Sequence, residues 1–264
     1  MDIATLIGLV AALVGLLGGM IFKGVSLSAL GNLAAIFIII IGTIGAVLIA
    51  FPMSDIKNLP SLFGRVFSDK KGAVDHQATI KTLVEYAQIV RKDGALSLES
   101  RIAGTQSPFL KRGLTLLMMG MKPEEIEEVL ATDLGAQERR HSANAHIFTQ
   151  AGTYAPTLGV LGAVIGLIAA LANMGDQVAL GHAISAAFMA TVYGIFTGYV
   201  LWHPFANKLK RKSKEEALNN TIIIEGILSL AAGDSPVLTQ EKMVSLLSTK
   251  EKEKFLNNTG GGEV

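Results

Sequence analysis

Threonine hydroxyls are the reactive or ion-binding groups that recur in the most apolar parts of this 264-residue chain. Thr149, Thr153 and Thr157 follow one another every four residues, which places their hydroxyls on one face of a helix. Thr191 lies in a later apolar stretch. Such hydroxyls either bond to carbonyls of their own helix or line a polar path for ions, and the sequence leaves both interpretations open. Neither interpretation supplies an acid or a base.

Motifs for nucleophilic catalysis, phosphate binding and metal binding are absent. The chain has no Cys, and its glycine-rich run at 159–166 lacks the Lys-Ser/Thr of a phosphate-binding loop. The histidines are not spaced for a metal site, and we expect all of them at the surface or at interfaces. We therefore expect no enzymatic activity and no cofactor. The histidines are His76, His141, His146, His182 and His203.

Four apolar stretches must position the threonines: residues 3–22, 31–51, 151–172 and 182–202. Each is close to the roughly 20 residues that cross a bilayer as a helix, and none contains Asp, Glu, Lys or Arg. The sequence predicts an all-α, polytopic membrane protein with four transmembrane helices. If this chain conducts ions, we expect another chain to supply the titrating group. The net charge of +1 gives no reason to expect nucleic-acid binding.

Basic residues predict the orientation of these spans. The loop 52–150 holds 13 Lys and Arg and the segment 203–264 holds 9, whereas the two short connections contain only Lys23. Because cytoplasmic loops are enriched in Lys and Arg, the long loop, the tail and both termini are predicted to be cytoplasmic. The domains are then 1–51 with two spans, 52–150 as a helical cytoplasmic domain, 151–202 with two more spans, and 203–264 as a helical tail.

Capping residues predict the helices of the long loop. Asp75 is placed to begin a helix that Gly94 ends, and Ser107-Pro108 is typical of another helix start. A helix beginning at Pro123 has no clear breaker before the third span and is expected to continue into it.

The C-terminal segment shows one further break. The fourth span is expected to run through its basic exit to about Ala232. A break at 233–236, one short helix and a disordered end at 257–264 should then follow.

Small residues mark the fourth span as a close-packing helix. Ala186, Ala190, Gly194 and Gly198 recur every four residues, which predicts a tight helix–helix seam. Pro156 interrupts the third span, and Pro204 ends the fourth. The sequence does not decide whether Pro156 forms a static kink or a hinge. It also does not decide whether Pro204 is a plain helix boundary or has a functional role.

Three segments resemble the A subunit of the flagellar stator, the MotA/PomA/MotP family, in its Gram-positive MotA form. They are AGTYAPTLGVLGAVIG at 151–166, the fourth span and its exit from 181 to 209, and RKDGALSLE at 91–99. The resemblance covers at least residues 1–255, including the two short loops and the long one.

The resemblance implies a pentameric ring of A subunits in the bacterial cell (inner) membrane, in contact with lipid. The ring surrounds a dimer of B subunits that carries the essential membrane Asp, and ion flow past this Asp turns the ring. The cytoplasmic domain then pushes on the rotor protein FliG. Arg91 and Glu99 match the charged pair that engages FliG, although solvated surface charges are the simpler interpretation.

Other roles follow residue by residue from the same resemblance. Pro156 and Pro204 match prolines linked to ion-driven conformational change, and Thr191 matches a threonine near the ion path, to which we add Thr153 and Thr157. Ala163 stands where sodium-driven relatives carry Thr. A hydroxyl there helps to coordinate Na⁺, so its absence favours H⁺ as the driving ion.

Three other classes of protein compete with this interpretation. A proton-channel ring subunit of the ExbB/TolQ type resembles the chain only across the third and fourth spans and lacks the first hairpin. A secondary transporter should carry broken helices and its own carboxylates in the membrane, which this chain lacks. A passive membrane scaffold is the third class, and a neighbouring gene for a one-span partner with a membrane Asp would argue against it.

Overall fold

A computed structural model describes residues 2–68, 74–172 and 174–259. All regular structure in these ranges is helical, which confirms the all-α prediction. Four helical stretches are long and apolar enough to cross a membrane, as predicted. They run over Ile3–Phe22, Leu33–Ala50, Pro123–Leu171 and Gln177–Ala232.

The helices form two compact units, 1–70 with 141–211 and 71–140 with 212–264. We call the first the membrane unit and the second the helical unit. These divisions differ from the predicted domain boundaries because segments flanking the spans pack with them. Helix α5 (Leu59–Phe67) buries Leu62 and Val66 in a cluster with Phe148 and Phe205. Neither α5 nor the short α4 (Met53–Ile56) before it was predicted from the sequence.

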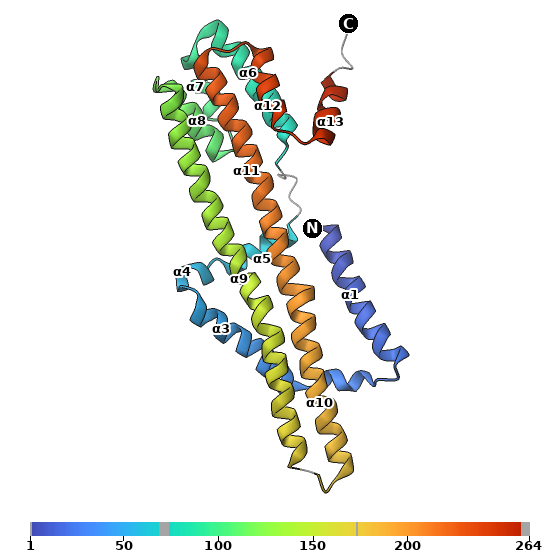
Figure 1. The fold of residues 1–264 in the computed structure, drawn as a ribbon. Coiled ribbons are helices and arrows are strands. Elements are labelled where there is room, and N and C mark those ends of the chain that lie inside the picture. Colours follow the sequence, from blue (N-terminus) through green and yellow to red (C-terminus); the bar gives the residue numbers. More distant parts are fainter. Residues whose placement is uncertain (1, 69–73, 173, 260–264) are drawn as a thin grey trace. The chain divides into compact units, whose positions relative to one another are not determined.

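The membrane unit contains the four spans, which Figure 1 labels in chain order. Helix α1 is mostly exposed, and Met20 is its one buried residue. Two spans each contain a π-helical turn, which sequence reasoning did not predict. Besides α4 and α5, its elements are α1 (Ile3–Phe22), η1 (Leu27–Gly31), α2 (Leu33–Ile36), the π-turn η2 (Phe37–Ile41), α3 (Gly42–Ala50), α9 (Pro123–Leu171), α10 (Gln177–Phe196), the π-turn η4 (Thr197–Trp202) and α11 (His203–Ala232). Of α9 and α11, only residues 141–171 and 203–211 belong to this unit.

The predicted caps define the helices of the helical unit. Asp75 accepts hydrogen bonds from the backbone N–H groups of Gln77 and Ala78 to start α6 (His76–Asp93). Gly94, at φ +80°, ends this helix in a conformation that side chains disfavour. Helix α8 (Pro108–Met118) starts after Ser107, and α9 starts at Pro123 and continues through the third span, all as predicted.

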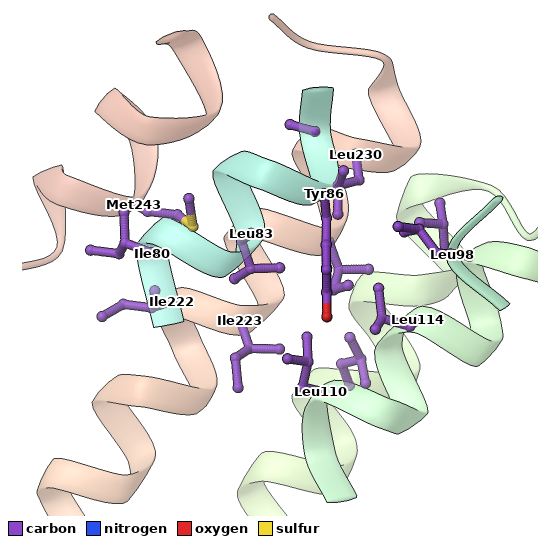
Figure 2. Close-up of a cluster of buried hydrophobic side chains, with 14 of the residues drawn as sticks. Ile80, Leu83, Tyr86, Leu98, Leu110, Leu114, Ile222, Ile223, Leu230 and Met243 are labelled. Carbon is purple, nitrogen blue, oxygen red and sulfur yellow. The ribbon is translucent and has the colours of Figure 1, made fainter. Parts of the chain in front are cut away.

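One hydrophobic core holds the helical unit together. Side chains from α6, η3 (Ala95–Leu98), α8, α11 and α12 (Pro236–Ser245) converge on it, with α7 (Glu99–Ile102) adding Ile102. Figure 2 shows Leu83 and Tyr86 of α6 facing Leu114 of α8 and Ile223 of α11. Burying such side chains contributes roughly 1.5–3 kcal/mol each, so this core fixes the unit.

The C-terminal tail differs from its prediction. Two helices follow the break at Gly233, namely α12 and α13 (Thr249–Thr259), where one was expected. Residues 257–259 are helical rather than disordered because α13 buries Phe255 in the core just before them. The rest of the predicted disordered end, 260–264, lies outside the described residues.

The small residues of the fourth span lie against the third span of the same chain. A Cβ added at Gly194 would lie 2.7 Å from the Ala155 carbonyl oxygen and 2.9 Å from the Gly159 Cα. A Cβ added at Gly198 would lie 2.8 Å from the Gly152 carbonyl oxygen. Real Cβ atoms do not approach this closely, so the two helix backbones are in direct contact. We name this contact between α9 and the fourth span the α9–α10 seam.

The predicted run of four small residues enters the seam only in part. Ala190 joins Gly194 and Gly198, since a Cβ added at Gly159 would lie 2.9 Å from the Ala190 carbonyl oxygen. Beyond it Ala187, not Ala186, faces the seam, with its Cβ 2.8 Å from a Cβ added at Gly166. An α-helix has 3.6 residues per turn, so residues spaced by four drift slowly around the helix. After two such steps the residue that faces the seam is therefore three, not four, positions away.

The seam yields a prediction that distinguishes crowded from open glycines. Gly194→Ala should destabilise the protein by about 1–3 kcal/mol, because the added methyl group pushes the two backbones apart. Gly45→Ala in α3 is the matched control, because no atom lies within 4 Å of its added Cβ and Ala favours helix over Gly. Thermal unfolding of the purified variants measures the difference. Equal stability of the two variants would contradict the proposed contact.

Candidate functional site

Pro156 lies inside α9, at the centre of the seam. A proline has no N–H, so the carbonyl of Gly152, four residues earlier, loses its helical donor. Gly198 of the fourth span packs here: its added Cβ would lie 2.8 Å from both the Gly152 oxygen and the Pro156 Cγ. The structure therefore brings together the predicted coupling proline and the predicted packing glycine, and it leaves α9 continuous.

Pro204, the second predicted coupling residue, lies at a different contact. It lies two residues after the last residue of the π-turn η4, and the helix continues beyond it as α11, so it is not a plain helix boundary. Together with Val200 and Phe205 it lines an open groove of about 470 Å³, which Ala4 and Gly8 of α1 border on the other side. A π-turn widens the helix and often occurs at functional positions, and here it adjoins a proline.

An ion pair joins the start of the first span to the exit of the fourth. The Lys208 ammonium contacts the Asp2 carboxylate and donates to the Thr5 hydroxyl. Asp2 also caps α1 by accepting from the Ala4 N–H at 3.1 Å and from the Thr5 hydroxyl at 2.7 Å. The contact brings the N-terminus of α1 next to the basic exit of the fourth span. Sequence reasoning missed this pair because it depends on packing between distant segments.

The three threonines of the third span follow the simpler of the two interpretations. The hydroxyls of Thr153 and Thr157 donate to the carbonyls of Thr149 and Thr153, each at 3.1 Å, and that of Thr149 donates to Ala145 at 3.3 Å. Thr153 and Thr157 are exposed on the surface of this single chain. Their oxygens therefore face outward, where each retains an acceptor lone pair.

Ala163 and Thr191 are half-buried near the seam. Ala163 follows Pro156 by seven residues, about two helical turns, and therefore shares its face of α9. Thr191 follows Ala190, which lies in the seam. The predicted ion-path residues are thus distributed between the seam and the exposed threonine face.

Arg91 and Glu99, the predicted rotor-binding pair, are exposed at the two ends of one turn. Arg91 lies in the last turn of α6 and Glu99 begins α7. The turn between them is held by Leu98, fully buried in the core, and by the Ser97 hydroxyl, which donates to the Gly94 carbonyl at 2.5 Å. Within the described ranges neither charged side chain has an ion-pair partner, so both charges are available to another molecule.

Histidine and metal chemistry add nothing to this site. Among the residues described here, no group of three His, Asp or Glu side chains is placed to hold a metal ion. The expectation that every histidine is at a surface or interface is wrong for His76, which is 6% exposed.

Known proteins with similar sequences and structures point to one family. A model of the MotA/TolQ/ExbB proton channel family matches residues 102–221, and a model of the motility protein A N-terminus matches 6–94. Motility protein A of Bacillus subtilis is 53% identical over 97% of this chain and 94% of its own length.

Two solved MotAB complexes contain chains that are similar to this one in sequence and in structure. The flagellar MotAB stator complex from Bacillus subtilis contains a chain that is 53% identical, with a TM-score of 0.88 over 95% of this chain and 98% of that one. MotAB of C. jejuni matches at 31% identity and a TM-score of 0.88, over 94% of this chain and 97% of that one.

The N-terminal match distinguishes the stator from its nearest rival. It covers the first hairpin of spans, which ExbB/TolQ-type subunits were expected to lack. The chain therefore belongs to the motility protein A family of flagellar stator subunits, within the MotA/TolQ/ExbB proton channel family.

Proposed function

We propose that this stator subunit conducts protons only together with a partner chain that supplies the titrating acid. The observation that carries the proposal is the composition of the spans: 3–22, 33–50, 151–171 and 177–202 contain no Asp, Glu, Lys or Arg. A proton channel needs a group that binds and releases the ion, and a carboxylate is stable in the membrane only inside a protein-lined interface. The partner is a B-type subunit, as in the MotAB complexes of the relatives.

The assembly is a pentameric ring around a dimer of that partner, as the family resemblance implies. Because α9 of the same chain occupies the seam of the fourth span, the partner helix must contact other faces. The exposed Thr153 and Thr157 hydroxyls provide one polar face on the third span. Exposed apolar side chains on α1 and α3, such as Leu6, Ile7 and Ile49, suit lipid or a neighbouring subunit.

The driving ion in this proposal is H⁺. Na⁺ in a protein site needs several oxygen ligands, whereas a proton needs only a titratable carboxylate. Ala163 has no oxygen in its side chain, so this position offers Na⁺ no ligand.

Torque is transferred through the turn between α6 and α7. Arg91 and Glu99 present opposite charges on a turn anchored in the core, which suits a charged surface of the rotor protein FliG. This requires the helical unit and both termini to be cytoplasmic. The distribution of basic residues supports that orientation, because 22 of the 23 Lys and Arg lie in the long loop and the tail and only Lys23 lies in a short connection.

Reversing the charge of Arg91 tests the rotor contact. Arg91→Glu should reduce motility strongly while the complex still assembles, because the side chain is exposed and makes no contact that holds the fold. Lys111→Glu, an exposed charge reversal on α8, is the control and should swim normally. Swimming speed and the amount of assembled complex are measured together. Loss of the complex in Arg91→Glu would make Arg91 a structural residue and contradict the proposed role.

Replacing sodium with potassium tests the driving ion. A strain without stators, expressing this chain with its cognate B subunit, should swim at the same speed in both buffers. Motility that stops without sodium would leave the family assignment intact and show that the proton assignment based on Ala163 is wrong.

A further inference from the structure

The open groove beside Pro204 runs along the exit of the fourth span, on the side that faces α1. Its volume is about 470 Å³, and its lining on this span reaches from Tyr199 to Lys208. At 1.5 Å per residue, this stretch of helix is roughly 14 Å long. Ala4 and Gly8 of α1 line the opposite wall, and both are exposed. Because neither has a long side chain, α1 leaves the space between the two helices open.

Contacts at one end fix the two walls of the groove. Phe205 lines the groove and is only 6% exposed, and its ring lies 5.5 Å from that of Phe67 in α5. The backbone N–H of Asp2 donates to the Phe67 carbonyl at 3.0 Å, and the Asp2 carboxylate pairs with Lys208. Helix α1 is therefore joined both to α5 and to the fourth span at this end. The groove is thus a built feature of the membrane unit.

The two ends of the groove differ in polarity. Leu9 and Val200 line it with apolar side chains, whereas Lys208 lies at the basic end. Arg211 follows Lys208 by three residues, so it continues the same face of the helix. Its side chain is exposed, and among the described residues it has no ion-pair partner. Since Asp2 already pairs with Lys208, Arg211 is the cation available to another molecule at this end.

A molecule with one apolar part and one anionic part matches this arrangement. The molecules that meet an open apolar groove within a bilayer are lipid chains, which are as apolar as Leu. Lys and Arg directly outside a span attract the anionic headgroups of lipids. The planar guanidinium of an arginine also presents two parallel N–H donors that suit a phosphate. An acyl chain and a phosphate on the same molecule would therefore satisfy both ends of the groove.

We propose that the groove between α1 and the fourth span binds an acyl chain of an anionic phospholipid, whose headgroup phosphate contacts Arg211. A helix of a neighbouring chain suits the groove less, because a helix about 10 Å across fills roughly 400 Å³ with each turn. The groove would hold little more than one such turn, whereas a lipid chain is narrow and lies along the spans. The proposal concerns lipid binding only, so it stands or fails apart from proton conduction.

A chain bound here would contact both irregular features at the exit of the fourth span. Tyr199 and Val200 belong to the π-turn η4, and Pro204 is a predicted coupling residue. Any movement of the helix at Pro204 would therefore change the wall against which the lipid packs.

Native mass spectrometry of the purified stator complex, this chain with its B subunit, measures bound lipid directly. The complex is incubated in detergent with dioleoyl phosphatidylglycerol, and the retained lipid is counted. Gly8→Leu places a side chain in the groove, and no atom lies within 4 Å of the added Cβ, so the variant should fold. Retained lipid should fall at least about fivefold, because apolar contacts of the chain are lost. Gly15→Leu, at an equally open and exposed glycine of α1 outside the groove, is the matched control and should retain lipid as the wild type does.

Two glutamine variants test the headgroup contact. The wild-type complex should retain phosphatidylglycerol about fivefold better than phosphatidylcholine with the same chains, because one cation near the surface favours the anionic lipid by that amount. Arg211→Gln should lose this preference. Lys210→Gln is the control, because Lys210 is exposed but lies two residues from Lys208, on another face of the helix. It should keep the preference.

Three results would overturn the proposal. Equal lipid retention by the wild type and Gly8→Leu, including none by either, would show that the groove holds no lipid. Loss of the assembled complex in Gly8→Leu but not in Gly15→Leu would assign the groove to a neighbouring chain. A preference for phosphatidylglycerol that is absent from the wild type, or unchanged in Arg211→Gln, would show that no headgroup phosphate is held there.

Discussion

Direct backbone contact between the third and fourth spans is the constraint on which the membrane unit depends. In a bilayer no hydrophobic effect drives two apolar helices together, so their association depends on close packing. Gly194 and Gly198 allow that packing, and it occurs at Pro156, where α9 lacks a backbone donor. The faces that remain outside the seam are then the ones available to a partner chain. Any bending of the third span at Pro156 would therefore change its contact with Gly194 and Gly198 of the fourth span.

The second constraint is electrostatic. The spans carry no formal charge, and an ion pair between Asp2 and Lys208 joins two charges at the start of α1. The spans of this chain therefore contain no carboxylate that could bind and release a proton. The threonine hydroxyls, which are hydrogen-bonded within their own helix, do not titrate and cannot take that role. The relatives solved as MotAB complexes are consistent with the proposal that a second subunit supplies the titrating group.

Local signals made much of the fold predictable. Asp75, Gly94 and Ser107 act within a few residues of themselves, so their caps and helix ends could be read directly. Span lengths depend on composition and were also predictable. Features that depend on packing between distant segments were not, such as the π-turn before Pro204, the replacement of Ala186 by Ala187 in the seam, and the burial of His76 between α11 and α13. Arg91 and Glu99 were predicted through family resemblance and their role stays a prediction, since sequence spacing alone does not distinguish them from solvated charges.

Proton flux through reconstituted membranes tests the central claim most directly, namely that the titrating group lies on another chain. Vesicles containing this chain alone, the complex with its B subunit, and the complex whose B subunit has Asn for its membrane Asp would be compared under the same proton gradient. The account predicts flux from the intact complex only. A robust flux from this chain alone would contradict it, because the four spans would then conduct protons without a carboxylate.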